Sequence, residues 1–130
     1  PYIVWGSGQA VRQFIFARDV ARVALDIIER DLDSTTTIIA PDPGITIRSL
    51  AETIAVAMDY TGPILFDRSQ PEGMLTKRLQ SACFTSRFPT FQFTALSNGL
   101  AETIRWFAQR ASSAETVGAT SSCDARANRR

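Results

Sequence analysis

The chain has 130 residues, of which 45% are hydrophobic, and a formal net charge of +1. This composition is ordinary for one folded domain, and the near-neutral charge excludes a strong attraction for nucleic acid or membrane surfaces. There is no histidine, so serine or cysteine nucleophiles have no histidine base, and no apolar run approaches the ~20 residues of a membrane span.

The cysteines and the N-terminus indicate the cellular compartment of the protein and whether the chain is a fragment. Cys83 and Cys123 lack the spacing of a metal site or a disulfide framework, which is typical of a reducing compartment and predicts a cytoplasmic protein. The N-terminus has neither the basic region nor the apolar segment of a signal peptide. The chain begins at Pro1 instead of an initiator methionine, so we expect a fragment of a longer protein.

The N-terminal part predicts two strands and a helix. Strands are expected at Tyr2–Trp5 and Arg12–Ala17, on either side of a Gly6-Ser7-Gly8 turn. Asp19 is then expected to cap a helix. The apolar residues of this helix recur at the spacing of one helical face: Val20, Val23, Ala24, Ile27 and Ile28.

The middle of the chain predicts two further strands around a second helix. The run Thr35–Ala40 is rich in β-branched residues, which favour strands, and a proline-rich turn follows it at 41–44. Helical spacing then runs from Ile47 to Met58, with Thr46 as the cap. Another strand is expected at Ile64–Asp67.

The C-terminal part predicts a short helix carrying a buried Cys83, then a helix from Leu96 to Ala111 behind Thr94. Residues 112–130 have too little apolar surface to offset the entropy of ordering, so we expect a disordered tail. The order β-β-α-β-α-β-short helix-α indicates an α/β fold, with residues 1–111 as its one domain.

The first run that can carry chemistry joins the glycine turn to the second strand. The planar guanidinium of Arg12 can grip two phosphate oxygens at once, and Trp5 can pack against a base or a sugar ring. The alternatives are an Arg12 that pairs with Asp19 or is simply solvated, and a Trp5 that belongs to the core or to a hairpin. The residues alone leave these alternatives open.

The second run extends from Phe66 to Leu79. A strand ends in Asp67, a Pro-Glu-Gly turn follows, and a Lys-Arg pair precedes an apolar residue. Glu72 can accept hydrogen bonds from two neighbouring sugar hydroxyls, and Lys77, the only lysine, can approach a phosphate or a sugar hydroxyl. The alternative is a polar surface loop without a ligand.

Together the two runs resemble one family. Trp5-Gly6-Ser7-Gly8, Arg12-Gln13-Phe14-Ile15 and Asp19-Val20-Ala21 are similar to the entry of the substrate domain in extended short-chain dehydrogenases that act on nucleotide sugars. The Asp67-to-Lys77 run and the closing Trp106-Phe107 pair resemble the GDP-L-fucose synthase family within that group. The resemblance covers Tyr2 to about Arg110.

This resemblance implies a fold and a binding site. The chain would be the C-terminal substrate-binding part of an extended short-chain dehydrogenase, with the Rossmann core largely missing. Trp5, Arg12, Glu72 and Lys77 would bind the GDP-sugar, with Arg12 toward the diphosphate. The family usually has Asp at the position of Glu72, and Lys is common where this chain has Gln70.

The resemblance also implies what other parts of a parent enzyme would supply. In the family the NADP(H) loop and the catalytic Ser-Tyr-Lys set lie upstream, and neither motif occurs here, so we expect this chain alone to be inactive. It would hold no catalytic, cofactor-binding or metal-binding residue. The parent would be a homodimeric epimerase-reductase that makes GDP-L-fucose from GDP-4-keto-6-deoxy-D-mannose, without nucleic-acid or membrane partners.

Two other functions stay open. The chain could be the substrate domain of another nucleotide-sugar epimerase or dehydratase, one that takes a dTDP- or UDP-sugar. It could also be a truncated, catalytically dead interaction module without a ligand. The departures at Gln70 and Glu72 and the unusual tail favour the module.

Overall fold

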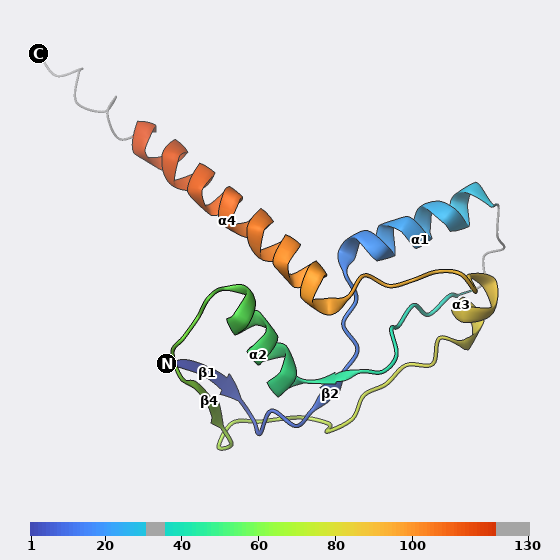
Figure 1. Ribbon diagram of the computed structural model, residues 1–130, viewed down its shortest axis with the longest axis horizontal. Coiled ribbons are helices and arrows are strands. Elements are labelled where there is room, and N and C mark those ends of the chain that lie inside the picture. The colour runs from blue at the N-terminus through green and yellow to red at the C-terminus, as the bar shows by residue number, and fades with distance from the viewer. Residues whose placement is uncertain (31–35, 122–130) are drawn as a thin grey trace, which may run out of the picture.

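The structure describes residues 1–30 and 36–121, in which strands and helices alternate as predicted except that the third strand is not the predicted one (Figure 1). The structure is a computed structural model. Its elements are β1 (Tyr2–Trp5), β2 (Val11–Arg12), α1 (Ala17–Glu29), β3 (Ile45–Thr46), α2 (Ile47–Ala57), β4 (Ile64–Asp67), α3 (Ala82–Arg87) and α4 (Leu96–Ser121). The mixed α/β fold class is therefore confirmed.

The strands β1 and β4 are confirmed and form a two-stranded parallel sheet. Ile3 lies opposite Leu65, and Trp5 lies two residues farther along the same face. These three side chains are 57%, 50% and 66% exposed, respectively. Because parallel sheets are normally covered on both faces, this pair has the apolar character of strands from a larger buried sheet.

The second predicted strand is wrong beyond Arg12. β2 pairs antiparallel with β3, with Val11 opposite Thr46 and Arg12 opposite Ile45. After Arg12 the chain leaves this short ladder, and residues 13–16 connect it to α1 without strand structure. The reason lies in the partner strand, since β3 has only two residues and the second of them, Thr46, already caps helix α2.

The predicted strand at Thr35–Ala40 is wrong in its described part, residues 36–40, while Thr35 lies outside the described residues. The carbonyl oxygen of Ala40 accepts a hydrogen bond from Ser81 Oγ at 3.1 Å instead of joining a ladder. Pro41 and Pro43 follow, and neither has a backbone N–H to donate to a neighbouring strand. The β-branched composition therefore did not overcome the lack of a ladder partner.

Helix α1 begins before the predicted cap. Phe16 is its N-cap residue, and Asp19 is buried in the first turn. There Asp19 accepts hydrogen bonds from the backbone N–H and Oγ1 of Thr94, at 2.7 and 2.9 Å, and Arg22 lies 3.3 Å away. A buried carboxylate requires such partners. Asp19 thus joins α1 to the segment before α4, and Thr94 serves this contact two residues before α4 begins.

Helix α2 begins as predicted. Thr46 is its N-cap residue, and the Thr46 Oγ1 accepts the backbone N–H of Ser49 at 3.0 Å. The first two residues of the helix, Ile47 and Arg48, donate their backbone N–H groups to the carbonyl oxygens of Ala10 and Gly8, respectively, each at 2.9 Å. The first turn of α2 is therefore anchored to the end of the glycine turn.

An aromatic cluster forms the described core between α1, α3 and the connector to α4. Phe84 is 2% exposed, and its ring centroid lies 5.2–5.6 Å from those of Phe88, Phe91 and Phe93. Val23 of α1 completes the buried cluster. The short helix α3 is confirmed, but the expected burial of Cys83 is wrong, because Phe84 occupies the inward face and Cys83 is exposed.

Helix α4 continues beyond the predicted end at Ala111 and reaches Ser121 (Figure 1). The prediction of a disordered tail is therefore wrong for 112–121, and its remainder, 122–130 with Cys123, lies outside the described residues. The boundary of the substrate-binding domain at residue 111 stays a prediction. Within the described ranges, no helix combines the length and the apolar character that a membrane crossing requires.

Replacing Phe84 with Ala is expected to lower the free energy of unfolding of the 130-residue chain by about 3–5 kcal/mol, because the change opens a cavity at the centre of the cluster. Chemical denaturation measures the loss. Phe107→Ala is the matched control, since Phe107 is 67% exposed. Equal effects of the two substitutions would contradict the assignment of the core.

Candidate functional site

The two runs predicted to carry chemistry lie side by side in the structure. The backbone N–H of Val11 donates to the carbonyl oxygen of Leu75 at 2.7 Å, and that of Lys77 donates to the carbonyl oxygen of Val11 at 3.3 Å. Nearer the start of both runs, the backbone N–H of Gly6 donates to the backbone carbonyl oxygen of Asp67 at 2.8 Å. Backbone hydrogen bonds therefore fix the register of residues 5–13 against residues 67–79.

Arg12 is held by carbonyl groups and not by an acid. Its Nη1 donates to the carbonyl oxygen of Val11 at 2.7 Å, and its Nη2 donates to that of Met74 at 2.9 Å. In the described part of the chain, none of the ion pairs includes Arg12, and Asp19 is committed to Thr94. The alternative of an Arg12–Asp19 pair is therefore wrong. A half-buried guanidinium with N–H groups to spare is suited to bind an anion.

Trp5 ends β1 and is 66% exposed, so it lies outside the core that the described residues form. It stands directly before Gly6 and opposite Asp67 in the sheet register. An exposed indole at the end of a strand offers a flat apolar surface. Trp5 and Arg12 thus flank the glycine turn, each at the end of a strand.

Glu72, which belongs to the second run, contacts the glycine turn at Gly6 and Ser7. Ser7 Oγ donates to Glu72 Oε1, and a Cβ placed on Gly6 would lie 3.0 Å from the Glu72 Cβ. Gly6 also has a φ of +84°, so this position requires glycine on two grounds. The Ser7 hydroxyl, aided by backbone N–H groups of the turn, lowers the pKa of Glu72 and favours its carboxylate. Sequence reasoning missed this contact.

Lys77 and Gln70 are the remaining polar residues of the second run that the sequence singled out. Lys77 is exposed next to the backbone bond that joins it to Val11. Gln70 Nε2 donates to Asp67 Oδ2 at 3.2 Å. Ser69 Oγ donates to Asp67 Oδ1 at 2.6 Å, and the hydrogen bonds from Ser69 are the main cause that lowers the pKa of Asp67. Gln70 therefore supports the turn after β4.

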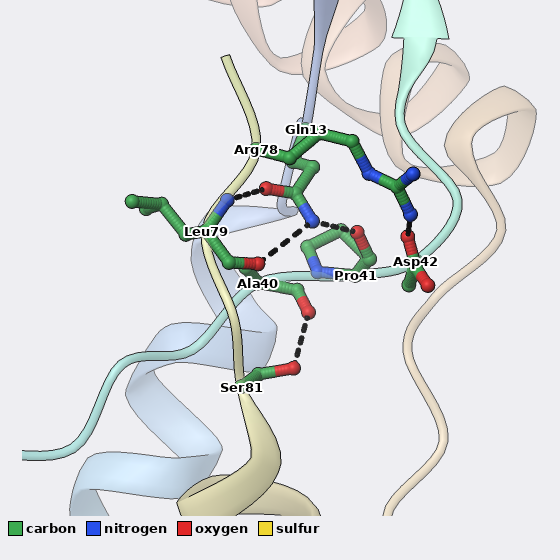
Figure 2. Close-up of polar contacts among 7 residues, drawn as sticks. All are labelled: Gln13, Ala40, Pro41, Asp42, Arg78, Leu79 and Ser81. Atoms are coloured by element: carbon green, nitrogen blue, oxygen red, sulfur yellow. Dashed lines mark hydrogen bonds and ion pairs between the residues drawn. The ribbon is translucent and has the colours of Figure 1, made fainter.

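Gln13 joins three segments and was not singled out by the sequence. Its Nε2 donates to the carbonyl oxygens of Pro41 and Leu79 at 3.0 and 3.3 Å, while its Oε1 accepts the N–H of Leu79 at 2.7 Å (Figure 2). Beside it, Arg78 of the second run forms an ion pair with Asp42 (Figure 2). A glutamine after a short strand carries no pattern that would have revealed this role.

Arg48 is the other residue that sequence reasoning missed. Its guanidinium carbon lies 3.8 Å from the centroid of the Phe66 ring, and its Nη2 donates to the carbonyl oxygen of Ser7 at 3.4 Å. The expected helical spacing placed residue 48 on α2 but gave no sign of these contacts.

The arrangement has the polar and charged groups that can bind and orient a ligand. The described residues hold no group of three or more acidic, cysteine or histidine side chains that could bind a metal ion. The polar side chains at the turn are engaged with one another, and Arg12 and Lys77 supply positive charge beside them. Trp5, Arg12, Glu72 and Lys77 all lie on the two paired runs, which is the expected neighbourhood, while their contact with a ligand stays a prediction.

Comparisons with known proteins agree on one group. No family model matches the chain. The GDP-L-fucose synthase of Escherichia coli (strain K12) is 32% identical over 114 residues, which cover 81% of this chain and 35% of that protein. The crystal structure of a GDP-L-fucose synthetase from Naegleria fowleri bound to NADP has a TM-score of 0.79 and 30% identity, covering 85% of this chain and 35% of that one.

A more distant likeness shows the fold alone. The UDP-glucose 4-epimerase of Thermotoga maritima, solved with UDP-glucose, has a TM-score of 0.69 at 18% identity. The chain spans about a third of the length of the relatives that it matches. By sequence and by fold, the chain is similar to the C-terminal part of GDP-L-fucose synthases, and its fold matches the corresponding part of extended short-chain dehydrogenase/reductase epimerases.

Proposed function

We propose that this chain supplies the nucleotide-sugar-binding part of an NADP-dependent epimerase-reductase, and that its ligand is a GDP-sugar on the route to GDP-L-fucose. One observation carries the proposal. Arg12, which no described carboxylate neutralises, is fixed by the Val11 and Met74 carbonyls, on a run that also holds the exposed Trp5 and that pairs with the run carrying Lys77.

The chemistry of these residues matches a nucleoside diphosphate linked to a sugar. The remaining N–H groups of Arg12 can bind diphosphate oxygens in a planar, bidentate manner. Because two carbonyl oxygens already hold the guanidinium, little side-chain freedom is lost when the ligand binds. The Trp5 indole offers a surface for a base or a sugar ring, and Lys77 adds a second positive charge.

NADP(H) is assigned to the remainder of a parent protein. A dinucleotide phosphate site needs a glycine-rich turn between a strand and a helix. In the described residues, α1 begins after Phe16 and α2 after Thr46, while the Gly6–Gly8 turn leads into β2 and is closed by Glu72. These residues do not fit the cofactor, so hydride transfer and sugar epimerisation belong elsewhere and the chain alone is inactive.

The exposed sheet face supports a larger parent. Ile3 and Leu65 leave an apolar surface on a parallel strand pair, and such pairs are normally buried within sheets that carry helices on both sides. We place the cofactor-binding part of the parent against this sheet. The parent is proposed to be a cytoplasmic homodimer.

Two alternative functions stay open: the substrate domain of a related nucleotide-sugar enzyme, and an interaction module. Only contacts with the ligand would distinguish them from the proposed function. The ligand of a related enzyme is a UDP- or dTDP-sugar, and an interaction module would bind none. Titrating the intact polypeptide with GDP, UDP and dTDP separates the three: saturation by GDP ahead of the other two supports the proposal, a preference for UDP or dTDP favours the related enzyme, and binding of none of them favours the module.

Arg12→Ala is expected to weaken GDP binding by the intact polypeptide by roughly 10- to 150-fold, which corresponds to ~1.5–3 kcal/mol for a charge-assisted hydrogen bond. Arg12→Lys should recover only part of the loss, because an ammonium group cannot replace the bidentate guanidinium. Isothermal titration calorimetry measures both variants. Arg105→Ala, on exposed α4, is the control. Unchanged affinity in a folded Arg12→Ala variant would remove Arg12 from the site.

The Glu72–Ser7 contact predicts a pH-dependent stability. Because the pKa of Glu72 is lowered in the folded state, its contribution is fully present above the ordinary pKa of a glutamate and is lost as pH falls through the lowered value. Glu72→Gln should therefore destabilise the 130-residue chain more at neutral pH than at acidic pH.

Thermal unfolding on both sides of the ordinary glutamate pKa measures this difference. Ser7→Ala is the partner variant, because it removes the hydroxyl that is the largest cause of the lowered pKa. In the Ser7→Ala background the pH dependence of the Glu72→Gln effect should shrink. A Glu72→Gln effect that does not vary with pH would contradict the assigned contact.

A further inference from the structure

The turn between β1 and β2 joins Trp5 to Arg12, so its shape contributes to their relative placement together with the pairing of each strand. Gly6 and Gly8 both have positive φ, +84° and +77°, conformations that other residues adopt at a cost. A turn built on two glycines has considerable conformational freedom of its own. Contacts from outside the turn must therefore fix its shape.

Phe66 and Arg48 hold one side of this turn. A Cβ placed on Gly8 would lie 2.5 Å from Phe66 Cε1 and 3.2 Å from the Arg48 Cβ, so the backbone at Gly8 lies directly against both residues. The carbonyl oxygens of Ser7 and Gly8 accept hydrogen bonds from the Arg48 Nη2 and backbone N–H, respectively. Glu72 holds the turn at Gly6 and Ser7.

The Arg48 guanidinium makes two contacts at once. At 3.8 Å, its contact with the Phe66 ring is the shortest cation–π distance among those found in the described residues, where the others range from 5.0 to 5.6 Å. The same group donates to Ser7. A planar guanidinium can stack on a ring while an edge N–H donates, which an ammonium group cannot reproduce.

We infer that Arg48 is a positioning residue for the nucleotide-sugar site: through Phe66 and the Ser7 carbonyl it fixes the glycine turn, and through the turn it sets the placement of Trp5 relative to Arg12. The inference rests on the proposed function for the importance of that placement, but not for the placement itself. Arg48 is assigned a role through the turn because both contacts of its guanidinium are made with the turn or with the ring that packs against it: the Ser7 carbonyl and Phe66.

The placement is tested first without any ligand. The intact polypeptide is labelled with 5-fluorotryptophan, and the fluorine resonance of Trp5 is assigned by its loss in Trp5→Phe. Arg48→Ala and Arg48→Lys should both shift or broaden this resonance, and so should Phe66→Leu, which removes the ring. Arg30→Ala is the matched control, because Arg30 makes a similar contact with Phe88 at 5.3 Å in another part of the fold.

The second measurement is the affinity for GDP. Arg48→Ala is expected to weaken GDP binding by about five- to tenfold, with little recovery in Arg48→Lys. In the Arg12→Ala background the same substitution should cost less, since Arg48 acts on the placement of Arg12. Equal losses in both backgrounds would show independent action and overturn the inference.

The outcomes separate this inference from the proposed function. If the wild type does not bind GDP but the Arg48 variants shift the Trp5 resonance, the proposed function fails and the positioning role stands. If the wild type binds GDP and the folded Arg48 variants leave both the resonance and the affinity unchanged, the positioning role fails alone. Should Arg48→Ala not fold, Arg48→Lys and Phe66→Leu decide by the same measurements.

Discussion

The pairing of Val11 with residues 75–77 is the constraint on which the candidate site depends. Its two backbone hydrogen bonds, to Leu75 and from Lys77, hold together segments that are more than sixty residues apart in the chain. Once this register is set, Met74 meets the guanidinium of Arg12 and Glu72 meets Ser7. Side chains alone would not specify this placement, because each contact is a single bond at the surface.

Local sequence patterns predicted the elements whose determinants are local. The strands β1 and β4, and the start of α2 at Thr46, depend on the residues of their own segments, and all are confirmed. Local sequence patterns gave wrong predictions where a residue far along the chain determines the local structure. Asp19 resembles a helix cap, but Thr94, far along the chain, takes its carboxylate, and the run at 36–40 lacks a strand partner despite its β-branched residues.

The same distinction applies to the site. The resemblance singled out two runs, and the structure brings those runs together, so the neighbourhood was predictable from sequence. The supporting contacts were not. Gln13, Arg48 and the Ser7–Glu72 bond depend on atoms that only the tertiary fold brings within reach. Ligand residues leave motifs because of their chemistry, whereas residues that brace a turn are of ordinary types in ordinary helices and strands.

Hydrogen–deuterium exchange of the intact polypeptide, with and without saturating GDP, tests most directly whether the two paired runs act as one ligand site. The account predicts that GDP slows exchange in residues 5–13 and in residues 67–79 together, including the amides of Val11 and Lys77 that join them. Exchange in the aromatic cluster around Phe84 should not change. Protection confined to one run, or centred on the cluster, would contradict the claim that these runs form the site.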